Sequence, residues 1–108
     1  MPLFCLAVVW PASLYADSDP YYDLIYDFEV TVFCGIVDED LHAAYAAKRG
    51  QLEAQDKRNK DQLTRVRIKA MAAADREYNN RGLGGHRQWC ESDGRAGAER
   101  IYPNRMQQ

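Results

Sequence analysis

The hydrophobic and polar positions divide this chain into an apolar first segment and a series of helical patterns. Residues Met1 to Ala16 are apolar almost throughout and carry no charge before Asp17. From Tyr21, apolar residues recur at the spacing of an α-helix, which places them on one side of the chain. The pattern predicts an all-α domain, with a separate role for the first sixteen residues.

The first helix is predicted from Pro20 to about Cys34. Asp19 can cap its backbone N–H groups, Pro20 fits the first helical turn, and Gly35 suits the left-handed residue that ends a helix. Two neighbouring stripes follow its length, which predicts a central helix with partners on two sides; they comprise Tyr21, Leu24, Ile25, Phe28 and Val32, and Tyr22, Tyr26 and Phe33. A strand over residues 28–32, which also alternate, is the competing interpretation.

Two more helices and a short fourth segment follow. Asp38 is the predicted N-cap of the second helix, which includes Leu41, Tyr45 and Leu52 and precedes a polar turn within residues 53–60. The third helix runs from Asn59 or Lys60 to Arg81, with an apolar stripe formed by Leu63, Val66, Ala70, Met71, Ala74 and Tyr78. Gly82 would end it, with Leu83 contacting Tyr78. A short helix or turn then carries residues 86–90.

The chain therefore divides into three parts. Residues 1–16 are interpreted as a secretory signal peptide, because an apolar run of this length is broken by Pro11 and followed by small Ala16. Residues 17–93 form the helical domain, and residues 94–108 are predicted to be an irregular C-terminal tail. Two alternatives for the first segment are a membrane anchor, which needs about 20 apolar residues, and a buried part of the domain.

Export would give Cys34 and Cys90 a specific role. They are the two cysteines that remain after removal of residues 1–16, and an even number in an exported protein favours pairing. The sequence thus predicts a small bundle of three main helices plus a short fourth segment, stapled by one Cys34–Cys90 disulfide. In a reducing compartment they would instead be free core thiols.

Charge is unevenly distributed along the chain, although its net value is only −2. No Lys or Arg precedes Lys48, whereas Asp19, Asp23, Asp27 and other acids lie before it. We expect the acidic part to face the basic helices within one fold; a dipolar surface that steers a charged partner is the alternative.

Few residue patterns indicate chemistry. His42 and His86 have no neighbouring ligands at metal spacing, no Cys-x-x-Cys-His is present, and no serine lies in a nucleophile-elbow sequence. We therefore predict no catalytic, metal or cofactor site, and an enzyme using His86 with Asp75 is the least favoured hypothesis. Export also makes nucleic acid an unsuitable target for the basic helix.

Two groups of side chains are candidates for binding a partner. The loop after the third helix offers Arg81, His86, Arg87 and Trp89, of which the cations could hold an anionic group or a carboxylate. The start of the first helix offers Tyr21, Tyr22 and Tyr26 as an aromatic cluster. The alternatives are a tight interhelical connection for the loop and core packing for at least two of the tyrosines.

The segments Tyr22-Asp23-Leu24-Ile25-Tyr26-Asp27 and Val30-Thr31 lead to Cys34-Gly35, and residues 80–85 lead to Trp89-Cys90. Together they resemble small exported proteobacterial proteins of unknown function. The resemblance implies export and supplies no activity, cofactor or catalytic residue.

These observations favour a periplasmic or secreted, non-enzymatic protein that binds another envelope protein, as an accessory subunit or inhibitor. The alternative function is a small-ligand or lipid-binding module with a pocket lined by Tyr21, Phe28 and Trp89. Contact with a membrane surface through the basic helix is a further candidate, and the mature chain is predicted to have no transmembrane span.

Overall fold

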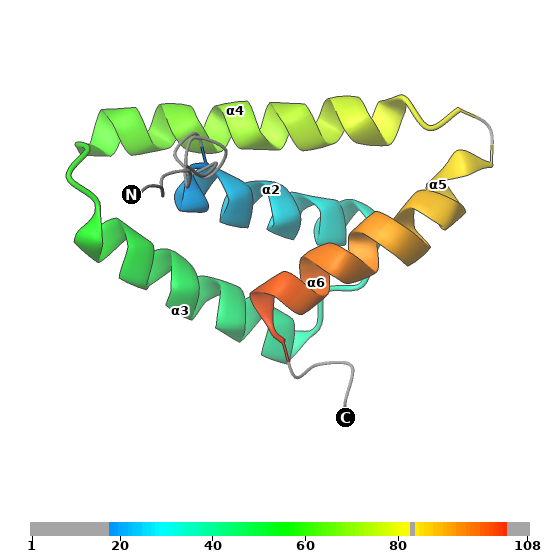
Figure 1. Cartoon of the computed structure of the whole chain (residues 1–108), viewed down its shortest axis with the longest axis horizontal. Coiled ribbons are helices and arrows are strands. Elements are labelled where there is room, and N and C mark those ends of the chain that lie inside the picture. Colours follow the sequence, from blue (N-terminus) through cyan, green and yellow to red (C-terminus); the bar gives the residue numbers. More distant parts are fainter. Residues whose placement is uncertain (1–17, 83, 104–108) are drawn as a thin grey trace, which may run out of the picture.

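The computed structural model describes residues 18–82 and 84–103, and these form an all-α bundle (Figure 1). The three main helices are α2 (Pro20–Phe33), α3 (Glu39–Gln55) and α4 (Lys60–Asn79). A continuous helical segment follows, made of α5 (Gly85–Trp89), a π-helical turn η2 (Cys90–Gly94) and α6 (Arg95–Ile101). The predicted signal peptide lies outside the described residues.

The ends of α2 follow the signals in its sequence. The Asp19 side chain accepts hydrogen bonds from the backbone N–H groups of Tyr21 and Tyr22. At the other end, Gly35 has a φ of 67° and donates to Val32, while the Ile36 N–H donates to Thr31. This pair of bonds is the Schellman arrangement, which satisfies carbonyls that the last helical turn leaves free. The helix is confirmed, and the strand alternative is wrong.

Side-chain caps also position the two other main helices. The Asp38 carboxylate accepts from the Leu41 N–H, at 2.8 Å, and starts α3. Asn59 and Gln62 form a reciprocal capping box at the start of α4. Gly50 does not interrupt α3. The helix continues past it to Gln55, and the turn to α4 follows.

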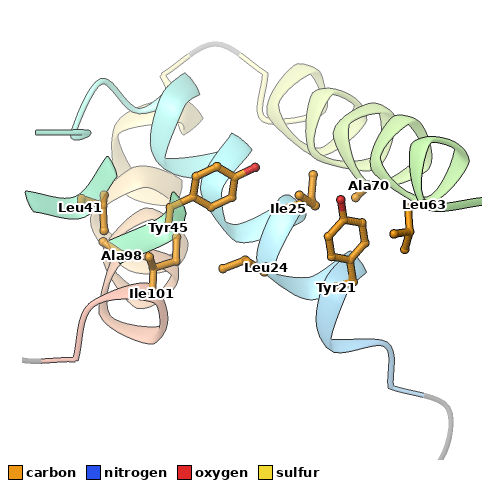
Figure 2. Packing of buried hydrophobic residues seen from close by; sticks show 9 residues of the cluster. All are labelled: Tyr21, Leu24, Ile25, Leu41, Tyr45, Leu63, Ala70, Ala98 and Ile101. Carbon is orange, nitrogen blue, oxygen red and sulfur yellow. The ribbon is translucent and has the colours of Figure 1, made fainter. Parts of the chain in front are cut away.

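The core is assembled around α2, as its two apolar stripes predict. Figure 2 shows the α2 side chains Tyr21, Leu24 and Ile25 between two sets of partners, Leu63 and Ala70 from α4 and Leu41, Tyr45, Ala98 and Ile101 from α3 and α6. A second, smaller cluster joins Val30, Ala74 and Trp89. Successive elements alternate in direction, so α4 and α2 run the same way and lie side by side (Figure 1).

The predicted irregular tail is wrong for residues 95–101, because these form α6. Ile101 is only 1% exposed and packs in the main core. Two glycines allow the close approach to α2: a Cβ at Gly94 would lie 3.0 Å from Cys34 Sγ, and one at Gly97 would lie 3.3 Å from the Asp27 carbonyl. The boundary between domain and tail therefore moves beyond Ile101.

Two members of the predicted apolar stripes do not enter the core. Val32 on α2 and Met71 on α4 are both exposed. On α4, Ala70 and Ala74 are fully buried in the two core clusters, whereas the neighbouring Met71 faces solvent. The predicted contact between Leu83 and Tyr78 lies outside the described residues.

The acidic first part and the basic later part of the chain meet inside the fold. Asp19 pairs with Arg58 at 2.8 Å, and the buried Asp27 receives two hydrogen bonds from Arg100, each of 2.9 Å. The exposed Arg100 side chain thereby connects α6 to α2 from the solvent side. These pairs match the expectation that part of the charge division is neutralised within one molecule.

Candidate functional site

The candidate site lies where the carboxyl ends of α2 and α4 meet α5, and we call this region the disulfide end. The Cys34–Cys90 disulfide joins α2 to the start of η2, with the two Cα atoms 5.5 Å apart. It closes a loop across 56 positions of sequence. The predicted staple is therefore present in the structure.

Three aromatic rings stack beside this disulfide, one from each helix. The rings of Phe33 and Tyr78 have centroids 4.8 Å apart, and those of Tyr78 and His86 are 4.2 Å apart. Because the His86 Nε2 lies 2.8 Å from the Tyr78 carbonyl oxygen, which can only accept, Nε2 must carry the proton that it donates. The stack and this bond fix the orientation of His86.

An open pocket of about 570 Å³ is formed against this stack. Its apolar walls come from α2, α4 and the disulfide, and its polar edge comes from the α5–α6 segment. The lining residues are Phe33, Cys34, Ile36, Tyr78, His86, Arg87, Cys90, Glu91 and Arg95. Cavities of this size hold a small molecule or one or two side chains of a partner protein.

The polar edge carries a row of three charges, Arg87, Glu91 and Arg95, which we call the charge row. They are four residues apart along a continuous helical segment, and all three are exposed. None of them forms an ion pair within the described residues. These charges are therefore available for a ligand, whereas Arg58 and Arg100 are occupied inside the molecule.

The structure divides the predicted loop cluster between two pockets. His86 and Arg87 belong to the pocket just described, whereas Arg81 and Trp89 line a second one of about 450 Å³. The Arg81 guanidinium binds Glu77 at 2.7 Å and lies over the Trp89 ring, 5.4 Å from its centroid. The Arg81 side chain is therefore engaged within the molecule, and it does not form one anion-binding site with His86 and Arg87.

The predicted tyrosine cluster is also divided. Tyr21 is 1% exposed, and its hydroxyl donates to Glu53 at 2.5 Å and accepts from Arg67 at 2.9 Å. Burial raises the pKa of Tyr21, and it also raises the pKa of Tyr26. Tyr22 and Tyr26 are half-buried and stack with centroids 6.5 Å apart. The role of Tyr21 as a contact residue is therefore wrong, because its side chain is core.

The pocket expected from Tyr21, Phe28 and Trp89 does not form. Tyr21 is enclosed in the main core, Phe28 stacks on the Tyr45 ring at 3.8 Å, and Trp89 belongs to the other core cluster. The small-ligand hypothesis consequently has to rest on the pocket at the disulfide end.

The hydrolytic hypothesis pairs His86 with Asp75. His86 donates to the Tyr78 carbonyl, while Asp75 is exposed on α4, so the pair suggested for hydrolysis lacks the expected hydrogen bond. Across residues 18–82 and 84–103, no group of three His, Cys, Asp or Glu side chains converges as a metal site would require.

Sequence reasoning missed five residues of the pocket as site residues: Phe33, Ile36, Tyr78, Glu91 and Arg95. The two aromatic residues were assigned to helix stripes, and their ring stack depends on tertiary packing. Glu91 and Arg95 did carry a signal, since Arg87, Glu91 and Arg95 recur at the spacing of one helical turn. The two glycines at positions 94 and 97 concealed it by arguing against a helix there.

In the part of the chain that the structure describes, every helix is too short or too polar to cross a membrane. Comparison of the chain with protein-family models, with curated proteins and with solved structures gave no match. The functional argument therefore depends on the residues of the pocket.

Proposed function

We propose that this chain is an exported, non-enzymatic protein that binds another envelope protein through the pocket at the disulfide end, as an accessory subunit or inhibitor. The observation that carries the proposal is the pair of exposed guanidinium groups, Arg87 and Arg95, beside an apolar wall. Cations without internal partners, next to apolar surface, are typical of contact residues. The disulfide supports export, because such bonds persist mainly in oxidising compartments.

Site-specific photo-crosslinking tests the binding part of the proposal. A photo-reactive phenylalanine replaces Glu91 in the pocket in one version of the full chain, and Arg65 on the exposed side of α4 in a matched control. In cells of the native host, we expect a defined crosslinked envelope protein from position 91 and not from position 65. Loss of this product in the Arg95→Glu variant would support the site. No product, or the same product from both positions, would contradict it.

Intact-mass measurement tests the export part. We expect protein recovered from the envelope to begin at Asp17 and to gain two hydrogens on reduction. A chain that retains Met1 and fractionates with the cytoplasm would overturn the assignment of residues 1–16 as a signal peptide.

The pocket volume favours small-ligand binding as the second candidate function. Native mass spectrometry of freshly purified protein tests it directly. A retained small molecule that is lost when Phe33→Ala removes part of the apolar wall would favour the ligand over the protein partner.

A further inference from the structure

The charge row provides more information about the partner than its sign alone. Arg87, Glu91 and Arg95 present positive, negative and positive charge in order along one edge of the pocket. The two arginines are eight residues apart, and the helical segment between them includes the π-helical turn η2. A surface that complements this row has negative, positive and negative charge at the same spacing.

From this row we infer that the segment recognised at the disulfide end is a helix of the partner protein with an acid–base–acid row at successive turns and an apolar side chain beside it. The inference rests on the proposed function and specifies the chemistry of the partner at the same pocket. Side chains four residues apart on a helix repeat at the spacing of the charge row, so two such helices can pair charge by charge. The apolar side chain would enter the pocket against Phe33 and Ile36.

The central acid is the reason to favour a protein segment over a membrane surface. Glu91 lies between the two arginines and would repel a continuous layer of anionic headgroups. The same carboxylate can pair with a lysine of the partner.

Peptide binding to the oxidised full chain tests the inference by fluorescence anisotropy at low salt. The probe is a synthetic helical peptide with Glu, Lys and Glu on successive turns and leucines on the adjoining face. A matched control peptide has the same residues in the order Glu, Glu and Lys. We expect the first peptide to bind more tightly, and each of Arg87→Ala and Arg95→Ala to weaken its binding by roughly two- to fivefold, as exposed charge pairs do.

A charge exchange separates recognition from a structural effect. The double variant Arg87→Glu/Arg95→Glu should no longer bind the first peptide. Adding Glu91→Lys gives a triple variant with all three charges reversed, and this variant should bind a peptide with the order Lys, Glu and Lys. Arg65→Glu is the control, since this exposed residue of α4 lies outside the pocket. Unchanged thermal unfolding of these variants establishes that they are folded.

Equal binding of the two isomeric peptides, or no effect of the arginine variants, would overturn the inference. Binding to phosphatidylglycerol vesicles with no peptide binding would overturn it in favour of a lipid surface. The crosslink from position 91 is a separate measurement: if it persists while the peptides fail, the partner is a protein of different chemistry and the proposed function stands.

Discussion

The two ends of α2 are held by different kinds of interaction. At its start, Asp19, Tyr21, Glu53, Asp56 and Arg58 form what we call the polar end, where hydrogen bonds and ion pairs join α2 to α3 and to the turn before α4. At its other end, the main connections are a disulfide and a stack of rings, together with the hydrogen bond from His86 to the Tyr78 carbonyl.

The difference determines which charges remain for binding. At the polar end, Arg58 bridges Asp19 and Asp56, and Arg49 and Arg67 both lie within ion-pair distance of Glu53. At the disulfide end, covalent and apolar contacts hold the helices, so Arg87 and Arg95 are not needed for packing. The arginines of the polar end are therefore structural, whereas Arg87 and Arg95 at the disulfide end are available to a ligand.

Among the changes that test this comparison, removal of the disulfide is expected to lower the free energy of unfolding most. The double variant Cys34→Ser/Cys90→Ser should lower the free energy of unfolding by about 4 kcal/mol, because the crosslink restricts a long loop in the unfolded chain. Urea unfolding measures the loss. Wild-type protein unfolded with reductant serves as the control and should show the same decrease. A decrease below about 1 kcal/mol would mean that the ring stack holds this end without the covalent bond.

The next largest effect concerns the polar end. Tyr21→Phe removes a buried hydroxyl that bonds both Glu53 and Arg67, and it should cost about 1–2 kcal/mol of unfolding free energy. Tyr22→Phe is the matched control, because no hydrogen bond of that hydroxyl is found in the described part of the chain and its side chain is half-buried. Equal stability of the two variants in urea unfolding would show that the hydroxyl network does not hold the polar end.

Acid should weaken the polar end selectively. Hydrogen bonding from Arg58 lowers the pKa of Asp19 below its usual 3.8 and that of Asp56 to about 2, and Arg49 lowers the pKa of Glu53 below 4.5. Protonation of these groups therefore favours the unfolded chain. Their stabilising contribution is complete above about pH 5 and is lost as the pH falls through the lowered values.

The measurement is urea unfolding between pH 5 and pH 2 in the wild type and in Arg58→Ala. We expect a smaller loss of stability with acid in the variant, because Asp19 and Asp56 no longer have a cation to lower their pKa. The effect is smaller than that of Tyr21→Phe, since these groups are partly exposed and water screens them. Parallel pH curves for the two proteins would contradict the assignment.

The same contrast explains how much could be predicted from the sequence. Local signals were sufficient for α2: Asp19 and Pro20 mark its start, Gly35 its end, and its two apolar stripes its central place. The Cys34–Cys90 pair followed from the expectation of export and from the count of cysteines. These are properties of adjacent residues or of composition, and they do not depend on how distant segments pack.

Apart from the helical spacing of Glu91 and Arg95, the features missed depend on tertiary contacts. Gly94 and Gly97 argue against a helix, yet α6 forms because their missing side chains allow close contact with Cys34 and Asp27. Tyr21 is amphipathic, and its place in the core depends on packing against distant segments, where its hydroxyl also meets Glu53 and Arg67. His86 and Trp89 are three residues apart on α5, but they line two different pockets. No single segment contains this information.

The smallest expected effect is the most direct test of the comparison. Arg58→Ala removes a guanidinium that bonds Asp19 and Asp56, and it should lower the free energy of unfolding at neutral pH. Arg87→Ala and Arg95→Ala remove exposed cations without ion pairs in the described chain, and each should change the unfolding free energy by less than about 0.5 kcal/mol. Thermal and urea unfolding of the three variants at one salt concentration provide the measurement. A marked loss of stability in Arg87→Ala or Arg95→Ala would assign these cations to the fold, and the reason for treating the charge row as a binding surface would disappear.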